Sequence, residues 1–320
     1  MHYLILVATP MEINPLLSRS TVLSESITPS GVRIISASLG KKDFKVVVTG
    51  PGVINTAHGL TVYLEHYIDN SKEHQSSLLI IQTGIAGYFK DSGLEMGDIA
   101  VATSETYIHT GVNREISSFS SSCSSYPYDP LPFDLVPDCP MSRQGHFEFD
   151  CNMIQKSCSI IEKGLTDLSF TATSLNAVNP LTAVNSEIAT NFEIAVNSET
   201  AVNSKRVTNF RAATNFSTEI NQSQSISFSL MTGNFITVSA ITSTTEHADK
   251  LFRAFDYPCM ESMEGAASAH IAALYNIPFL EIRAGSNPVG IRDKKQWDIP
   301  LACQNASFAL EALLEKGELF

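Results

Sequence analysis

The segment SMEGAASAHIAALYNIPFLEIRAGSN, residues 262–287, combines the two kinds of element from which the fold can be inferred. Its first half is rich in alanine and other small residues, and it predicts a helix that can approach a sheet closely. Its second half, IPFLEIRA, is a short apolar run that predicts a buried strand. Arg283, Ser286 and Asn287 occupy three of the last five positions of the segment. This polar strand end is either a turn or a ligand site.

The same alternation of apolar runs and helices recurs along the chain. Buried strands are predicted at residues 2–8, 44–49, 76–83, 96–109 and 228–242, and helices at 53–68, 151–165, 244–255 and 303–318. The glycine-containing sequence TGIAG at 83–87 is expected to turn the chain after its strand. Continuous runs of Val, Ile and Leu between helices predict a mostly parallel sheet that is covered on both faces.

Composition and charge narrow the class of protein. The chain has 320 residues, of which 43% are apolar, enough for one large α/β domain or two small ones. The net charge of −12 argues against nucleic acid or an anionic membrane surface as a partner. No apolar run approaches the roughly 20 residues of a spanning helix, and the N-terminus lacks a signal-peptide pattern. We therefore expect a cytoplasmic protein.

The histidines and the six cysteines show no spacing typical of a metal site, so we expect free thiols and neither a metal nor a cofactor. One stretch, about residues 171–222, has a different character. Asparagine recurs in it every six residues, at Asn179, Asn185, Asn191, Asn197, Asn203, Asn209, Asn215 and Asn221.

A hexapeptide period can build a β-helix, but Ala, Val and Thr are too small to fill such a core, and glycine is nearly absent from this stretch. The composition favours a low-complexity insertion outside the core. Since strands of the same buried type flank it, we predict one domain over residues 1–320, interrupted at about 171–222.

Two acidic residues stand next to predicted strands and helices. Glu12 follows the first strand and opens a helix, and Glu264 opens the alanine-rich helix. Each could simply complement a helix dipole. Alternatively, Glu12 is a general base at the carboxyl end of a parallel strand, where open α/β sheets bind ligands, and Glu264 accepts hydrogen bonds from a vicinal diol. Arg283 could form a salt bridge with Glu264 or Glu281.

Several motifs together resemble the nucleoside phosphorylase/nucleosidase superfamily. ATPME, TGPGVINTAHGL, IIQTGIAGYF, LEMGDIAVATSETY and the opening segment occur in the family's order. ETY, SMEGAA and RAGSNPVGIRD are most similar to the futalosine hydrolase branch, and the resemblance covers roughly residues 3–115 and 228–315. It implies a three-layer α/β/α fold around a mixed, distorted sheet, usually dimeric, and a nucleoside as substrate.

The resemblance also implies roles for particular residues. Glu12 matches the base that activates the attacking water, Arg283 a basic residue near that water, and Glu264 the acid that binds the ribose hydroxyls. Further matches are Met263 packing on the sugar, Ala86 and Gly87 near the ribose, Ile241 and Thr242 beside the base, and Ser286 and Asn287 at the purine.

The chain departs from the adenine-releasing members at informative positions. Asn287 stands where they have Asp, Ile85 where they have Ser, and Gly285 where an aliphatic residue is usual. An amide can donate to O6 of hypoxanthine and accept from protonated N7, whereas a carboxylate suits the amino group of adenine. Asn287 therefore favours a 6-oxopurine nucleoside, and the branch implies hydrolysis of futalosine to hypoxanthine and dehypoxanthine futalosine, in menaquinone biosynthesis.

Three alternatives stay open at this point. A purine nucleoside phosphorylase would need a cationic cradle for phosphate, for which Arg33, Lys41, Lys42 and Arg114 are the basic residues in reach. A methylthioadenosine/adenosylhomocysteine nucleosidase would release adenine, and an inactive binding protein would use the repeat.

Arg292 is either a solvated loop residue or the cation that meets the benzoate of futalosine.

Overall fold

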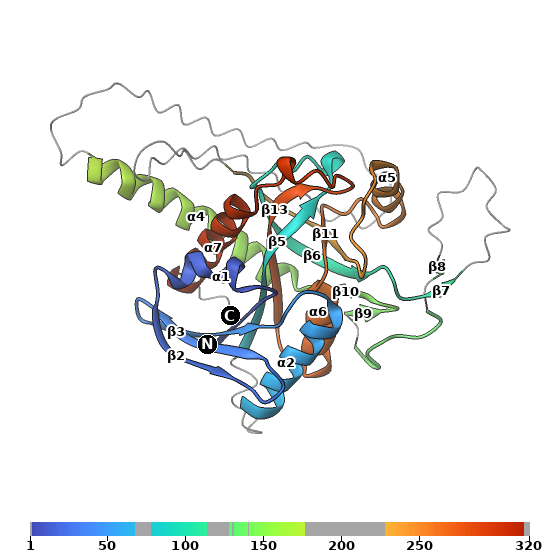
Figure 1. The fold of residues 1–320 in the computed structure, drawn as a ribbon, viewed down its shortest axis with the longest axis horizontal. Helices are drawn as coiled ribbons and strands as arrows, with labels where there is room; N and C mark the ends of the chain where they lie inside the picture. The colour runs from blue at the N-terminus through green and yellow to red at the C-terminus, as the bar shows by residue number, and fades with distance from the viewer. Residues whose placement is uncertain are drawn as a thin grey trace.

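An eleven-stranded mixed sheet runs through the centre of the molecule (Figure 1). The computed structural model describes residues 2–67, 78–113, 128–129, 131–139, 141–176 and 228–316. The strands of the sheet are β1 (His2–Val7), β2 (Thr21–Ile27), β3 (Arg33–Leu39), β4 (Lys42–Val48), β5 (Leu78–Tyr88), β6 (Ile99–Tyr107), β9 (Ser142–Arg143), β10 (His146–Glu148), β11 (Leu230–Thr237), β12 (Met260–Ser262) and β13 (Phe279–Pro288). A separate two-stranded ribbon pairs β7 (Val112–Asn113) with β8 (Tyr128–Asp129).

Parallel pairing is confined to the centre of this sheet. β1 lies between β4 and β5 and is parallel to both, β11 is parallel to β6 and β12, and β13 is parallel to β5. The outer strands β2, β3, β9 and β10 pair antiparallel. β13 also pairs antiparallel with β6, so it joins the two halves of the sheet. The predicted mixed and distorted sheet is confirmed.

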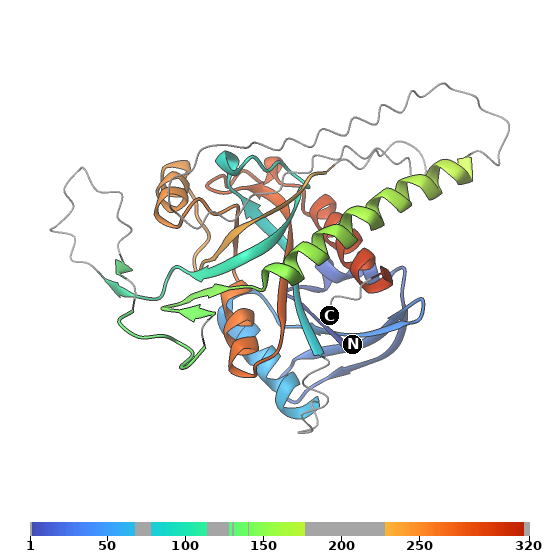
Figure 2. The same cartoon turned by 180° about the vertical axis from the view of Figure 1, so that it is seen from behind.

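Helices cover both faces of the sheet. The helices are α1 (Pro10–Leu17), α2 (Val53–Tyr67), α4 (Cys151–Asn176), α5 (Thr245–Ala254), α6 (Gly265–Leu274) and α7 (Ile299–Lys316), with short 3₁₀ turns at Lys90–Ser92 and Lys294–Gln296. On one face α7 contacts β5 and β13 and is flanked by α1 and α4, whereas α2 and α6 pack together on the other (Figure 2, seen from behind). The predicted α/β/α layers are present.

The main core lies between the sheet and these helices. Leu4, Ile5, Leu79 and Ile80 of the central strands are fully buried, and Leu310 of α7 packs in the same cluster. A second apolar cluster, which includes Phe89, Val238 and Leu251, lies beneath α5. Every strand that the sequence predicts supplies residues to one of these two apolar clusters. Burial of their apolar surface is the dominant favourable term in folding.

Two strands continue past the point where the sequence predicted their end. The glycines of TGIAG were expected to turn the chain, but β5 continues through them to Tyr88. β13 likewise continues to Pro288, with a register shift between Gly285 and Asn287. Each strand supplies the backbone partners of the other, so pairing across the sheet overrides the local turn preference of glycine.

The predicted insertion begins within a helix, because α4 continues to Asn176 and residues 177–222 lie outside the described residues. β11, β12 and β13, which follow the insertion in sequence, pair with β5 and β6, which precede it. This pairing supports the interpretation of one interrupted domain. No helix among the described residues is long and apolar enough to cross a membrane.

We predict that replacing residues 177–222 by a short Gly/Ser linker leaves the protein folded, because the change keeps α4 and β11 intact and the composition of this stretch predicts an insertion outside the core, where a change of length costs little. Thermal unfolding should then remain a single cooperative transition close to that of the full chain. As a control for sensitivity, Ile161→Ala removes a fully buried side chain of α4 and should cost about 2–5 kcal/mol. An insoluble linker variant would contradict the prediction.

Candidate active site

Four glutamates and one arginine come together in the interior, on or beside the neighbouring strands β5, β6 and β13. Arg283 is completely buried. Its Nε donates to Glu281 Oε1 at 2.9 Å, and its Nη2 lies 3.2 Å from Glu264 Oε2. Its Nη1 donates to the carbonyl of Ile85 at 3.3 Å. The predicted salt bridge of Arg283 is therefore present with both carboxylates that the sequence suggested.

These carboxylates keep the buried arginine charged. Burial alone disfavours a guanidinium cation, but Glu281, Glu264 and Glu12 offset this and raise the pKa of Arg283 above its usual value. The same cation opposes the effect of burial on the carboxylates. The ion pairs are therefore mutually dependent, and removal of one partner would leave an uncompensated charge in the interior.

Glu12 lies in the first turn of α1, and its side chain is only 5% exposed. One carboxylate oxygen accepts hydrogen bonds from the backbone N–H of Thr9 at 2.8 Å and from the Thr9 hydroxyl at 3.2 Å. The other accepts from the N–H of Ile85 at 3.1 Å. The carboxylate is thus more than a partner of the helix dipole, because it also ties α1 to β5.

The electrostatic surroundings of Glu12 suit a base. Burial raises the pKa of its carboxyl above the usual value, while Arg283 and the N–H of Ile85 act in the opposite direction. The negative charge of Glu264 raises it further. A carboxylate with a raised pKa accepts a proton more readily than an ordinary glutamate.

Gly84 makes room for Glu12 within β5. A Cβ atom at this position would lie 2.3 Å from Glu12 Oε1 and 3.4 Å from Arg283 Nη1. The backbone there also has φ of +140°, which side-chain-bearing residues rarely adopt. Gly84, the first glycine of TGIAG, is therefore required for the close approach of Glu12 and Arg283 to β5.

Glu264 occupies the N-cap position of α6. It is 5% exposed, and its Oε1 accepts from the N–H of Gly52 at 3.0 Å. Gly52 belongs to the TGPG turn between β4 and α2. Two of the motifs from which the resemblance was drawn, far apart in sequence, therefore meet at one carboxylate.

Ser286 and Asn287 lie at the register shift of β13, one strand away from Ala86 and Gly87 of β5. The Ser286 hydroxyl lies 3.1 Å from the carbonyl of Ala86 and 2.8 Å from Asn287 Oδ1. Asn287 Nδ2 donates to the carbonyl of Pro288 at 3.2 Å. The four residues predicted near the ribose and the purine thus form one group, with the Asn287 amide held by its neighbours.

The other predicted residues are more dispersed. Met263 directly precedes Glu264 and packs against the apolar cluster under α5. Thr242 is buried and its N–H donates to Glu261 Oε1 at 3.0 Å, whereas the side chain of Ile241 is 45% exposed. Arg292 is exposed, with its guanidinium carbon 4.8 Å from the Trp297 ring centroid.

Three buried glutamates were not assigned a role from the sequence: Glu105, Glu261 and, beyond its possible salt bridge, Glu281. Glu105 and Glu281 are fully buried and Glu261 is 5% exposed. The sequence did carry an indication of Glu105 and Glu281, because each is a charged residue within a predicted buried strand, and charged residues are rarely buried unless they are paired. Their partners could not be inferred, because these contacts depend on how β6, β12 and β13 are placed in the sheet.

The basic residues considered for a phosphate cradle do not gather at Glu12. Arg33 forms an ion pair with Glu25, and Lys41 and Lys42 lie at the β3–β4 turn, at the far end of β4 from Val48. Arg114 lies outside the described residues.

Among the described residues, no group of three or more His, Cys, Asp or Glu side chains is arranged to hold a metal ion. Five cysteines are free thiols as predicted, and Cys123 is outside the described part.

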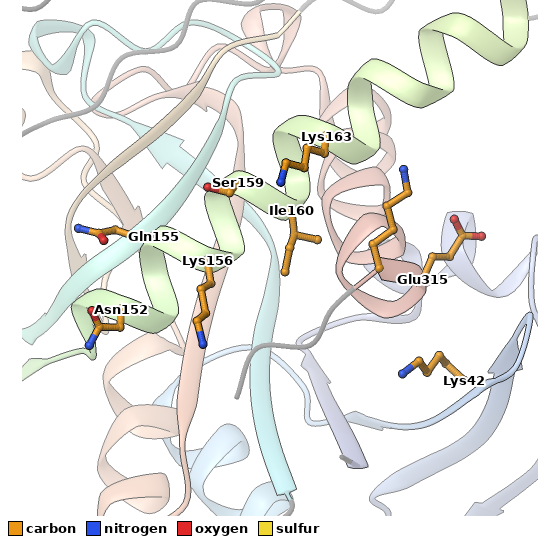
Figure 3. Close-up of a pocket in the computed structure, with 9 residues that line it drawn as sticks. Lys42, Asn152, Gln155, Lys156, Ser159, Ile160, Lys163 and Glu315 are labelled. Atoms are coloured by element: carbon orange, nitrogen blue, oxygen red, sulfur yellow. The ribbon is translucent and has the colours of Figure 1, made fainter.

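A separate surface hollow of about 960 Å³ is lined by neither Arg283 nor any of the four glutamates around it (Figure 3). It lies between β4, α4 and α7 and carries both lysine and polar side chains. Its lining consists of Lys42, Asn152, Gln155, Lys156, Ser159, Ile160, Lys163, Glu315 and Lys316. The hollow and the buried glutamate cluster are therefore different features of the molecule.

Comparison with known proteins shows similarity to one family model and to futalosine hydrolases. Residues 173–316 match the model of the Phosphorylase superfamily. A futalosine hydrolase of Acidothermus cellulolyticus is 40% identical over 81 residues, which are 25% of this chain and 33% of that protein. The match thus spans about a third of the length of that relative. The resemblance indicated by the motifs is confirmed.

Solved structures show the same fold. The native futalosine hydrolase of Helicobacter pylori superposes with a TM-score of 0.61 and 15% identity, over 99% of this chain and 98% of that one. A 5′-methylthioadenosine/S-adenosylhomocysteine nucleosidase of Colwellia psychrerythraea, in complex with adenine, also has a TM-score of 0.61, with 17% identity over 98% of this chain and 95% of that one. The chain has this nucleosidase-like fold.

We predict that Gly84→Ala destabilises the protein by several kcal/mol, because it combines a collision with Glu12 and an unfavourable backbone conformation. Gly31→Ala is the matched control, since Gly31 also has a positive φ, of +88°, but nothing lies within 4 Å of the added carbon. Denaturant unfolding should show a clearly larger loss for Gly84→Ala. Equal losses of stability in the two variants would show that the Glu12 side chain can move aside without an energetic penalty.

Proposed function

We propose that this chain hydrolyses the N-ribosidic bond of futalosine, releasing hypoxanthine and dehypoxanthine futalosine in menaquinone biosynthesis. The observation that carries the proposal is the placement of two buried carboxylates, Glu12 and Glu264, around the charge of Arg283, on the strand that ends with Ser286 and Asn287. Partial sequence similarity to futalosine hydrolases supports the choice of substrate.

The chemistry needs opposite charges at the two ends of the broken bond. Positive charge develops on the sugar and negative charge on the leaving purine, as in the oxocarbenium-like states of glycoside hydrolysis. Glu12 and Glu264 would place negative charge on the sugar side. Glu264 would accept hydrogen bonds from the ribose hydroxyls with the lone pairs that Gly52 and Arg283 leave free. Glu12 would take a proton from water as it attacks.

Asn287 would read the purine. Its amide is oriented by the Ser286 hydroxyl at Oδ1 and by the carbonyl of Pro288 at Nδ2. A 6-oxopurine offers an acceptor at O6 and, once protonated, a donor at N7, and an amide can satisfy both. An unmatched polar partner in such a site is strongly disfavoured, so this residue type supports release of hypoxanthine over adenine.

Arg292 would meet the benzoate end of futalosine. The loop that follows β13 presents this cation on the ring of Trp297, whose Nε1 donates to the carbonyl of Ile291 at 3.0 Å. A planar guanidinium that is held in this way can bind a carboxylate through two hydrogen bonds. A homodimer and a cytoplasmic location stay predictions from the sequence and its resemblance.

The experiment that tests the proposal is a turnover assay with futalosine, inosine and methylthioadenosine, in which the released base is identified chromatographically. Futalosine should be cleaved with the highest kcat/KM and should yield hypoxanthine. Preferred release of adenine from methylthioadenosine would show the alternative nucleosidase activity. No release from any of the three would leave the protein as a binding protein.

Glu12→Gln should lower kcat for futalosine by about 10²–10⁴-fold, because the amide keeps the shape of the side chain and cannot take the proton. In the wild type, activity should fall as the pH drops through the raised pKa of Glu12, and this acidic limb should be missing from the variant. Glu246→Gln is the matched control, since Glu246 is exposed and lies on α5. Near-normal turnover by Glu12→Gln would exclude the role.

Asn287→Asp should change the preference between purines. A carboxylate facing O6 lacks a donor, which should cost the 6-oxopurine substrate about 1–3 kcal/mol in transition-state stabilisation. The quantity to measure is the ratio of kcat/KM for futalosine to that for its adenine counterpart, because misfolding would lower both. The ratio should fall by roughly tenfold. An unchanged ratio would mean that Asn287 does not contact the base.

A further inference from the structure

Glu105 is a fully buried acid on β6 that the proposed chemistry does not use. Its Oε1 accepts a hydrogen bond of 2.5 Å from the hydroxyl of Thr237, on the neighbouring strand β11. That hydroxyl accepts in turn from the N–H of Ala266, in the first turn of α6, at 2.8 Å. One oxygen of Glu105 is therefore fixed by a chain of hydrogen bonds to the helix that carries Glu264.

The carboxyl group of Glu105 lies beside that of a second buried acid, Glu281, since both border Gly265. Glu281 Oε1 accepts from Arg283 Nε, whereas Glu281 Oε2 and Glu105 Oε2 have no other hydrogen-bond partner. Ionised carboxylates only accept hydrogen bonds, so two ionised groups could not satisfy these oxygens. A single proton between them would satisfy both.

Gly265 allows the two carboxyl groups to lie side by side. A Cβ atom there would come within 2.4 Å of Glu281 Oε2 and 2.8 Å of the carboxyl carbon of Glu105. Both groups thus lie against the same glycine, without water-exposed surface. Burial, together with the charge of Glu281, raises the pKa of Glu105 well above its usual value. Burial also raises the pKa of Glu281, although Arg283 opposes this effect.

We propose that Glu105 and Glu281 share one proton, and that this acid–carboxylate pair positions Arg283 for its ion pair with Glu264 and its charge interaction with Glu12. Its catalytic meaning rests on the proposed function. Four ionised glutamates around one guanidinium would leave three uncompensated negative charges in the interior, and the shared proton reduces this number. The remaining charge of Glu281 stays at Arg283 Nε and fixes the plane of the guanidinium.

The pair predicts an asymmetric response to substitution. Glu105→Gln should preserve the arrangement, because the amide accepts from Thr237 and donates to Glu281 as the protonated acid does. kcat/KM should stay within about threefold of the wild type, whereas Glu105→Leu, which removes the donor, should lose roughly tenfold or more. Glu281→Gln should also lose roughly tenfold or more, since it moves the negative charge away from Arg283. Equal damage by Glu105→Gln and Glu105→Leu would overturn the proposal.

Infrared spectroscopy tests the proton without any substrate. In heavy water near neutral pD, the wild type should show the C=O stretching band of a protonated carboxylic acid, and Glu246→Gln should retain it. The band should be lost in Glu105→Gln and in Glu281→Gln, so either variant suffices if the other fails to fold. Absence of the band from the wild type would overturn the proposal, even if futalosine is cleaved. Conversely, if the band is present but no nucleoside is hydrolysed, the shared proton is supported and only the proposed function fails.

Discussion

The ion pairs of Arg283 are the interaction on which the site depends. A fully buried guanidinium is tolerated only where carboxylates surround it, and here Glu281 and Glu264 are in contact with it, while Glu12 lies across Gly84. These acids come from three different elements, β13, the start of α6 and α1. The charge of one side chain therefore fixes how two helices meet the central strands, and a change at any member should be felt by the others.

The order of the strands explains why these groups can meet at all. β1, β5 and β13 are parallel neighbours, so their carboxyl ends lie at one edge of the sheet, where open α/β sheets bind ligands. Two glycines then allow contacts that a larger residue would prevent, Gly84 beside Glu12 and Gly265 beside the Glu105–Glu281 pair. The site is thus built by the close approach of charged side chains to glycine backbone, on strands whose apolar residues are buried in the core.

Much of this could be predicted from the sequence, because the central strands are continuous apolar runs and α6 carries small residues that suit close packing. The sequence also placed Glu12 and Glu264 correctly at the starts of helices. Arg283 was expected at the end of its strand but lies in the middle of β13, which continues to Pro288. The continuation of β5 through Gly84 was missed, since a strand's end is decided by its neighbours in the sheet. The partnership of Glu105 with Glu281 was missed for the same reason: no sequence spacing connects two strands that pair only in the folded protein.

The central chemical claim is that a water molecule, activated at Glu12, attacks the sugar. The most direct measurement is to incubate the protein with futalosine in oxygen-18 water that contains inorganic phosphate. The mass of the sugar product is then determined by mass spectrometry. Hydrolysis predicts one oxygen-18 atom in dehypoxanthine futalosine and a rate that does not depend on phosphate. A sugar phosphate as the product, or base release that requires phosphate, would contradict it.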